Sequence, residues 1–243
     1  MTAVVAAGRR FLPRGWADFA RQVLIWFGFI FAYQIARGLA DRDPAKAFAN
    51  SLRVVSFEQR WTHQLVELTF QRIVDSSKLL TTVAAWTYWN SEFTVVSLAL
   101  LWVYLRRHYA FARFRNTILV ANVLGLVGYV LLPTAPPRML PWLGFMDAPH
   151  HNGLVLLLAN PYAAMPSLHA ADALIVGLVL AAVCRRLVFK IVWLLWPLWV
   201  WFSVMATGNH FWLDVVAGVF VATIALVVVY RRDLRAQQAP ATA

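Results

Sequence analysis

The chain has 243 residues, of which 61% are hydrophobic and only 14% are charged. Soluble domains are nearer half apolar and a quarter charged, so this composition excludes an ordinary cytosolic protein, and it is too hydrophobic for a disordered chain. The single cysteine, Cys184, excludes a disulfide scaffold. A formal net charge of +11 would suggest a nucleic-acid partner for a soluble protein, but in so apolar a chain the placement of the basic residues matters more. The sequence therefore predicts a polytopic membrane protein that has membrane lipids, and no nucleic acid, as partners.

Six stretches of the chain are long and apolar enough to span a membrane, which takes roughly 20 residues for about 30 Å of hydrocarbon. They lie near residues 20–37, 89–105, 116–132, 167–184, 190–207 and 211–230. Between the first two, residues 44–74 place Phe48, Leu52 and Val55 on one side of a helix, which is typical of helices on a membrane surface. We expect an all-α protein with six transmembrane helices, interfacial helices between the first and second, and one domain over residues 1–243.

The basic residues lie mainly on one side of this six-span arrangement. Fourteen of the 22 Lys and Arg precede the first stretch, fill the second and fourth connections or follow the last stretch. Seven of the other eight lie in residues 37–88 beside five acidic residues, and the connection 133–166 has only Arg138. Because basic loops stay in the cytoplasm, both termini are expected there and the connections 38–88 and 133–166 outside. We expect a multi-pass protein of a bacterial plasma membrane.

Two polar motifs lie on the predicted outer side. Pro-Thr-Ala-Pro-Pro-Arg at 133–138 leaves Arg138 at the end of a turn stiffened by proline. Its guanidinium suits phosphate oxygens, although an Arg near a helix end can equally extend to lipid headgroups. Pro-Ser-Leu-His at 166–169 opens the fourth stretch, with Ser167 as the expected N-cap and His169 in the first turn. A helix N-terminus can bind an anion, but taken alone this motif is also compatible with a structural cap.

The third motif, Gly-Asn-His-Phe-Trp-Leu-Asp at 208–214, opens the last stretch. His210 and Asp214 are four residues apart and are predicted to share one face of a helix. Asp214 can then accept a hydrogen bond from one imidazole nitrogen and leave the other as a nucleophile or base. An Asp within an apolar span is costly, which favours a function over a pair that only joins helices. Together the three motifs supply cationic donors, a nucleophile and a second His as general acid, the parts of a phosphate-transfer site.

The three motifs resemble those of the type 2 phosphatidic acid phosphatase superfamily, and in particular its inositol phosphorylceramide synthase-like branch. The resemblance extends over residues 57–230. It implies a six-helix membrane fold and a metal-independent lipid phosphatase or phosphotransferase that needs no cofactor and forms a phosphohistidine intermediate. It also implies that His210 is the nucleophile, that Asp214 orients it and that His169 protonates the leaving group. Arg138 and Ser167 would bind the phosphoryl oxygens.

The chain departs from the wider superfamily at two cationic positions. Leu131 stands where that pattern has a Lys seven residues before Arg138, and Val204 stands where it has an Arg six residues before His210. Both are traits that the synthase-like branch shares. Fewer fixed cations favour a lipid phosphate over a highly charged diphosphate. Phosphatidate, polyprenyl phosphate and phosphoinositide-type donors all fit, and so do water or a polyol as acceptor.

Some polar residues have no role in the motifs. Asp172 and Asn209 are candidates for binding the headgroup, although Asp172 could instead pair with a neighbouring helix. The roles of Glu92, His150 and His151 stay open, as does the oligomeric state. A transporter that moves ions along the acidic residues of the spans is an alternative of another class. Such sites usually lie near the bilayer midplane between repeated halves, and no repeat is visible. A non-catalytic lipid-binding scaffold is a further alternative.

Overall fold

The computed structural model describes residues 12–40, 43–146 and 160–238. Within these ranges the regular structure is helical, apart from one isolated bridge between Thr134 and Ala163. The elements are α2 (Gly15–Leu39), α3 (Pro44–Thr62), α4 (Val66–Asp75), α5 (Lys78–Ser91), α6 (Thr94–Arg106), α7 (His108–Leu131), the short turns η1 (Pro137–Met139) and η2 (Pro141–Leu143), α9 (Leu168–Val183), α10 (Leu187–Ala206) and α11 (Trp212–Gln238). The expected all-α fold is confirmed for these residues.

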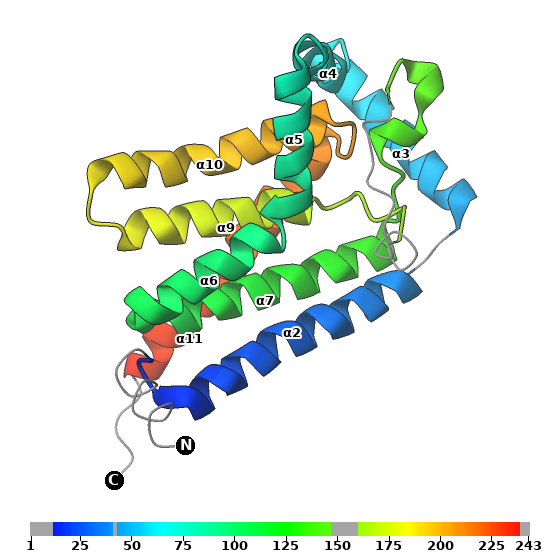
Figure 1. Cartoon of the computed structure of the whole chain (residues 1–243). Coiled ribbons are helices and arrows are strands. Elements are labelled where there is room, and N and C mark those ends of the chain that lie inside the picture. The colour runs from blue at the N-terminus through cyan, green and yellow to red at the C-terminus, as the bar shows by residue number, and fades with distance from the viewer. Residues whose placement is uncertain (1–11, 41–42, 147–159, 239–243) are drawn as a thin grey trace.

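Helix α9 is the centre of the bundle. It packs against α7, α10 and α11, and it also contacts α5 and α6. Nearly all of its side chains are buried, among them Leu168, Ile175 and Val176. A helix with apolar side chains on every side can bury all of these side chains only if other helices surround it. Helices α5, α6, α7, α10 and α11 therefore surround the helix that begins with the Pro-Ser-Leu-His motif, and α2 lies outside α7 (Figure 1).

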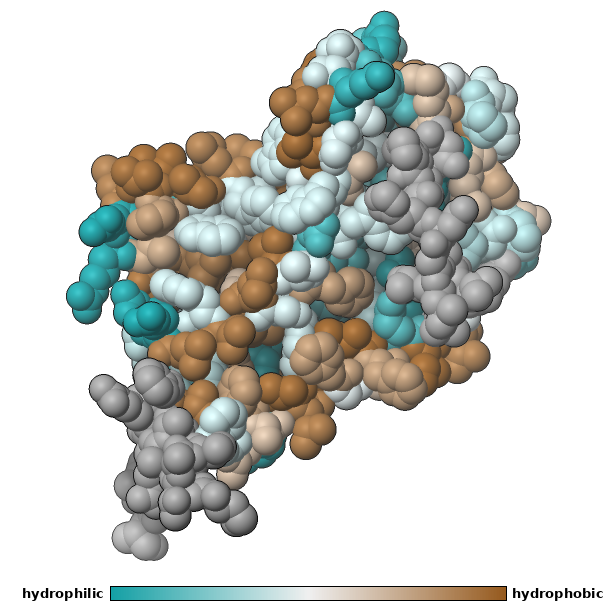
Figure 2. Space-filling model, in the orientation of Figure 1, coloured by the Kyte–Doolittle hydropathy of each residue, from teal (hydrophilic) through white to brown (hydrophobic). Residues whose placement is uncertain are grey.

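Four helices in the described residues are long and apolar enough to cross a membrane: α2, α7, α10 and residues 212–231 of α11. Helices α6 and α9 are apolar but shorter. Large hydrophobic side chains on the outside of the bundle are exposed, for example Leu24, Phe31 and Leu187. Figure 2 shows hydrophobic residues over much of the sides of the bundle and hydrophilic residues near its ends. This distribution is that of a membrane protein.

The stretch predicted at 89–105 is divided in the structure. Helix α5 ends at Ser91 and α6 begins at Thr94, and the two helices run in different directions (Figure 1). The predicted surface segment is also divided, into α3 and α4, with His63 in a left-handed conformation after α3. The other five predicted stretches each correspond to a single helix: α2, α7, α9, α10 and α11.

Glycines let α7 and α11 approach the start of α9 closely. A Cβ atom at Gly128 would lie 2.3 Å from the Pro166 ring, and one at Gly218 would lie 2.2 Å from the carbonyl oxygen of Ser167. Neither contact is sterically possible, so only glycine permits this packing. The backbone N–H of Ser167 also donates to the carbonyl oxygen of Asp214 at 3.0 Å. The second and third motifs are therefore fixed to each other.

Candidate active site

His210 lies in a tight turn between α10 and α11. Gly208 has a φ of 66°, a conformation that glycine adopts without strain. The backbone N–H groups of Asn209 and His210 both donate to the carbonyl oxygen of Val204, at 3.1 and 3.2 Å. The Asn209 amide also donates to the Thr207 hydroxyl at 2.9 Å. The turn is thus held by its own hydrogen bonds, and it fixes the backbone on which the imidazole stands.

The hydrogen bond that holds the His210 imidazole comes from a different group than the sequence predicted. Its Nδ1 lies 2.9 Å from the carbonyl oxygen of Ala164 and 3.5 Å from Asp214 Oδ2. His210 precedes α11, so the two residues do not share a helix face. Asp214 lies in the first turn and accepts a hydrogen bond from the backbone N–H of Phe211 at 2.9 Å. Asp214 therefore caps the helix and lies beside the imidazole, and the carbonyl group makes the shorter contact.

His169 stands in the first turn of α9, as expected. Ser167 is the N-cap, and its hydroxyl oxygen accepts from the backbone N–H of Ala170 at 3.3 Å. The imidazole stacks on the Tyr88 ring with centroids 4.6 Å apart, and its Nε2 lies 3.3 Å from Glu92 Oε2. Both partners come from the end of α5 and the residues just after it. This side of the site depends on the break between α5 and α6.

Arg138 is joined to the turn that carries His210. Its backbone N–H donates to the carbonyl oxygen of Gly208 at 2.9 Å, and its guanidinium donates to the side-chain oxygen of Asn209. The first motif is therefore fixed against the third, although 70 residues separate them in the chain. Such a charge-assisted hydrogen bond holds the planar guanidinium in one orientation.

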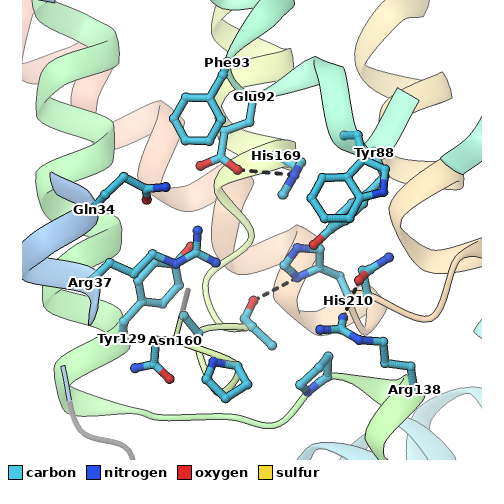
Figure 3. A pocket seen from close by; sticks show the side chains of 16 residues that line it. Gln34, Arg37, Tyr88, Glu92, Phe93, Tyr129, Arg138, Asn160, His169 and His210 are labelled. Atoms are coloured by element: carbon cyan, nitrogen blue, oxygen red, sulfur yellow. Dashed lines mark hydrogen bonds and ion pairs between the residues drawn. The ribbon is translucent and has the colours of Figure 1, made fainter. Parts of the chain in front are cut away.

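One cavity of about 330 Å³ brings these groups together. Figure 3 shows the imidazoles of His169 and His210 facing it, with ring centroids 5.5 Å apart. Of the residues selected from the sequence, His169, His210, Arg138 and Asn209 line the cavity. Both imidazoles are almost completely buried. The arrangement combines two imidazoles with a guanidinium, the parts needed to attack a phosphate and to protonate a leaving oxygen.

Three of the selected residues lie behind the cavity wall. Ser167 and Asp214 are fully buried and act as helix caps. Asp172 is 1% exposed, and the Asn122 amide of α7 donates to both of its carboxylate oxygens at 3.2 Å. Of its two proposed roles, the structure shows the pairing with a neighbouring helix. His150 and His151 lie outside the described residues.

Several cavity residues were not selected from the sequence. They come from α2, from α7 and from the segment before the second motif: Gln34, Arg37, Tyr129 and Asn160. The only sequence signal for them is a charge at the outer end of the first apolar stretch, at Arg37. That signal is also typical of an Arg that extends to lipid headgroups.

The fold and the cavity define a helical membrane protein whose three polar motifs meet in one site. The family description that matches residues 52–228 is the PAP2 superfamily. The chain belongs to the PAP2 superfamily, which confirms the resemblance to the type 2 phosphatidic acid phosphatases and makes the protein one of the membrane lipid phosphatase type. The synthase-like branch stays a prediction.

The crystal structure of LpxE from Aquifex aeolicus has a similar fold. The similarity covers 67% of this chain and 93% of that chain, with a TM-score of 0.54 and 19% sequence identity. At this identity the likeness concerns the fold alone. No curated protein matches the chain.

Proposed function

We propose that the protein is an integral membrane lipid phosphatase or phosphotransferase that works through a phosphohistidine on His210. One observation carries this proposal: His169 and His210 face the same cavity, 5.5 Å apart, with Arg138 beside them. The contact between His210 Nδ1 and a carbonyl oxygen supports the choice of nucleophile. A carbonyl oxygen only accepts hydrogen bonds, so Nδ1 carries the proton and Nε2 has a free electron pair.

In the first step, Nε2 of His210 attacks phosphorus, and the bond between phosphorus and the lipid ester oxygen breaks. The leaving oxygen takes a proton from His169, and the Glu92 carboxylate, 3.3 Å from the imidazole, stabilises the protonated ring before the transfer. Arg138 binds the phosphoryl oxygens and balances the charge that builds up on them. The Asp214 carboxylate, 3.5 Å from Nδ1, stabilises the positive charge on the His210 ring. The product is a neutral lipid alcohol and phospho-His210.

In the second step, an acceptor oxygen attacks the phosphorus of phospho-His210, and the bond between phosphorus and Nε2 breaks. His169, which lost its proton in the first step, takes the acceptor's proton. Water as acceptor gives inorganic phosphate. A polyol hydroxyl would give a new phosphate ester, the reaction expected of the synthase-like branch when the transferred group is a phospho-headgroup. Both acceptors use the same residues.

We place the cavity at the extracytoplasmic face, in a six-span arrangement in which α6 and α9 are the two shorter spans. Figure 1 supports this placement, because the start of α2, the α6–α7 and α9–α10 junctions and the end of α11 lie away from the motifs. Three of these places carry Arg pairs: Arg106 with Arg107, Arg185 with Arg186 and Arg231 with Arg232. Basic ends are cytoplasmic, so α3 and α4 lie at the outer interface.

The test is an assay of purified protein with phosphatidate, polyprenyl phosphate and phosphatidylinositol, each with and without inositol. With phosphatidate or polyprenyl phosphate, release of inorganic phosphate would identify a phosphatase, and formation of an inositol phosphate that depends on added inositol would identify a transferase. The His210→Ala variant should lose either activity. His63→Asn is the matched control, because Asn tolerates the left-handed conformation of a His outside the cavity. No turnover of any donor would contradict the proposal.

Activity should persist in EDTA, because the proposed positive charge at the phosphate comes from the guanidinium group of Arg138. Loss of activity in EDTA and its recovery with a divalent ion would contradict the phosphohistidine mechanism in this form.

A further inference from the structure

Helix α2 contributes one wall of the cavity, although it lies outside the family match to residues 52–228. Gln34 and Arg37, one turn apart, are the two residues through which it lines the cavity. The helix is tied to the bundle by Trp26, whose indole N–H donates to the Ser97 hydroxyl of α6 at 2.9 Å. It also packs against α7. The position of Arg37 is therefore set by the same bundle that holds the histidines.

The guanidinium of Arg37 is held over an aromatic ring but keeps a donor without a partner. Its central carbon lies 5.5 Å from the centre of the Tyr129 ring, a cation–π contact that fixes the planar group. Its Nε is buried and has no hydrogen-bond partner among the described residues. The same holds for Oε1 of Glu92, which also lines the cavity. Buried polar atoms are nearly always paired, so atoms at a cavity that have no protein partner are positioned to bind complementary groups there.

The two guanidinium groups of the cavity come from different sides. In Figure 3, Arg37 points into the cavity from the side of α2, and Arg138 lies on the other side, beyond His210. The two positions where the family pattern has further cations do not supply this second charge, because they hold Leu131 and Val204 and neither lines the cavity.

We propose that Arg37 is a second phosphate-binding residue, which binds the lipid phosphate from the side opposite Arg138. This inference rests on the proposed function, because it takes the ligand of the cavity to be a lipid phosphate. A planar guanidinium can form two parallel hydrogen bonds to a phosphate. Two cations on opposite sides stabilise a doubly charged phosphate monoester more than a singly charged diester. Arg37 therefore also contributes to the choice of headgroup.

The experiment measures binding separately from turnover. In a His210→Ala background, calorimetry gives the affinity for dioctanoyl phosphatidate and for dioctanoylglycerol, which lacks the phosphate. Arg37→Gln removes the charge, and Arg37→Lys keeps it without the planar fork. Arg21→Gln is the matched control, because it removes the same charge from the same helix at a side chain that is 70% exposed.

Arg37→Gln should weaken phosphatidate binding about 10- to 100-fold, the usual effect of losing hydrogen bonds to a charged group. Arg37→Lys should bind with an intermediate affinity, and Arg21→Gln should bind as the parent does. Dioctanoylglycerol should bind equally to all four proteins. A phosphate monoester gains its second negative charge at about pH 6. Phosphatidate affinity should therefore rise from pH 5 to pH 8 in the parent, and it should rise much less in Arg37→Gln.

Equal phosphatidate affinity in the parent and Arg37→Gln would overturn the role of Arg37. So would a matching loss of dioctanoylglycerol binding, which would mean that Arg37 only supports the shape of the cavity. Turnover by the native protein separates the two proposals. If that protein forms product while Arg37→Gln binds normally, only this inference fails. If binding depends on Arg37 but no donor turns over, the proposed function fails and the second phosphate-binding residue stands.

Discussion

The Nδ1 atom of His210 donates a hydrogen bond to the carbonyl oxygen of Ala164 at 2.9 Å. The acceptor belongs to the segment just before the second motif, and the donor belongs to the third. One contact between two distant segments thus selects the imidazole tautomer and directs the unprotonated nitrogen away from the protein backbone. Because a backbone carbonyl is present in every variant, this selection does not depend on any one side chain.

The two histidines should respond differently to substitution by Ala. His210→Ala should abolish turnover and the covalent phosphoenzyme with every substrate. His169→Ala should slow hydrolysis of lipid esters by about 10²- to 10⁴-fold, the usual contribution of a general acid. It should recover much of that loss with an activated aryl phosphate, whose leaving group needs little protonation. The measurement is trapping of radiolabelled phosphoenzyme without acid, together with rates on both ester types. Label on His210→Ala but not on His169→Ala would reverse the assignment.

Asp214→Asn should reduce the rate but leave the tautomer of His210 unchanged. The amide oxygen can still accept from the Phe211 N–H, and Ala164 still accepts from Nδ1. What is lost is the negative charge 3.5 Å from the ring, which stabilises the imidazolium form in the transition state. Nitrogen NMR of the imidazole should show the same protonated nitrogen in both proteins. A change of tautomer in Asp214→Asn would mean that the carboxylate controls it.

Two buried glutamates should make the protein less stable at alkaline pH. Glu58 and Glu67 accept hydrogen bonds from the backbone N–H groups of Leu213 and Trp212, at the start of α11, and both are fully buried. Burial, and then the neighbouring carboxyl of Glu67, raise the pKa of Glu58 to about 9, against an ordinary value of 4.5. The folded protein therefore holds a proton that the unfolded chain releases above pH 4.5, so stability falls as the pH rises from 4.5 through about 9.

Thermal unfolding in detergent at pH 6 and at pH 9.5 measures this effect. The unfolding temperature should fall between the two values, and Glu58→Gln should reduce the fall, because an amide stays neutral. The exposed Asp75→Asn is the control and should leave the fall as it is in the native protein. An equal fall in all three proteins would show that this carboxyl does not cause it.

Gly218→Ala should destabilise the protein by about 1–3 kcal/mol, the usual cost of overpacking. Its new methyl group would lie 2.2 Å from the carbonyl oxygen of Ser167, and a backbone atom of another helix cannot move aside alone. The matched control is Gly28→Ala in α2, where no atom lies within 4 Å of the new methyl group. That variant should be as stable as the native protein or more stable. Equal stability of both variants would contradict the close approach of α11 to α9.

The proposed topology can be tested with two single-cysteine variants in a Cys184→Ser background. Trp142→Cys in η2 should react with a membrane-impermeant maleimide from outside spheroplasts. Leu187→Cys at the start of α10 should react only after lysis. Both side chains are well exposed, at 63% and 69%, so burial should not limit labelling. The opposite pattern would place the cavity on the cytoplasmic side.

The sequence could identify the functional residues that belong to short motifs with a recognisable pattern. Arg138 directly follows Pro137 in the turn after α7, and His169 lies three residues after Pro166 in the first turn of α9. Topology alone places both on one side of the bundle. Arg37 could not be identified in this way, because no local pattern indicates which side of an apolar helix faces a cavity. Tyr129 could not be identified for the same reason, because it lies in the apolar second half of α7.

The helices that the sequence predicted are those formed by long apolar stretches. The apolar stretches at 20–37, 116–132, 167–184, 190–207 and 211–230 correspond to α2, α7, α9, α10 and α11. The break after Ser91 was missed, since no Gly or Pro marks it and apolar residues continue past it. That break matters, because it positions Glu92 beside His169. The hydrogen-bond partner of His210, the carbonyl oxygen of Ala164, was missed because every residue has a backbone carbonyl group. The sequence does not show which one lies beside the imidazole.

Gln34 and Arg37 line the cavity but lie before residue 52, where the family match begins. Two relatives that share every motif residue can therefore differ in the residues that line this side of the cavity. The reacting groups and part of the surface that receives the headgroup thus belong to separate segments. Under the proposed role of Arg37, the motifs would indicate the reaction of such a relative, and its first helix would be needed as well to indicate its lipid. If Arg37 binds the lipid phosphate as proposed, exchanging α2 between two such proteins should change the lipid they accept and leave the histidines in place.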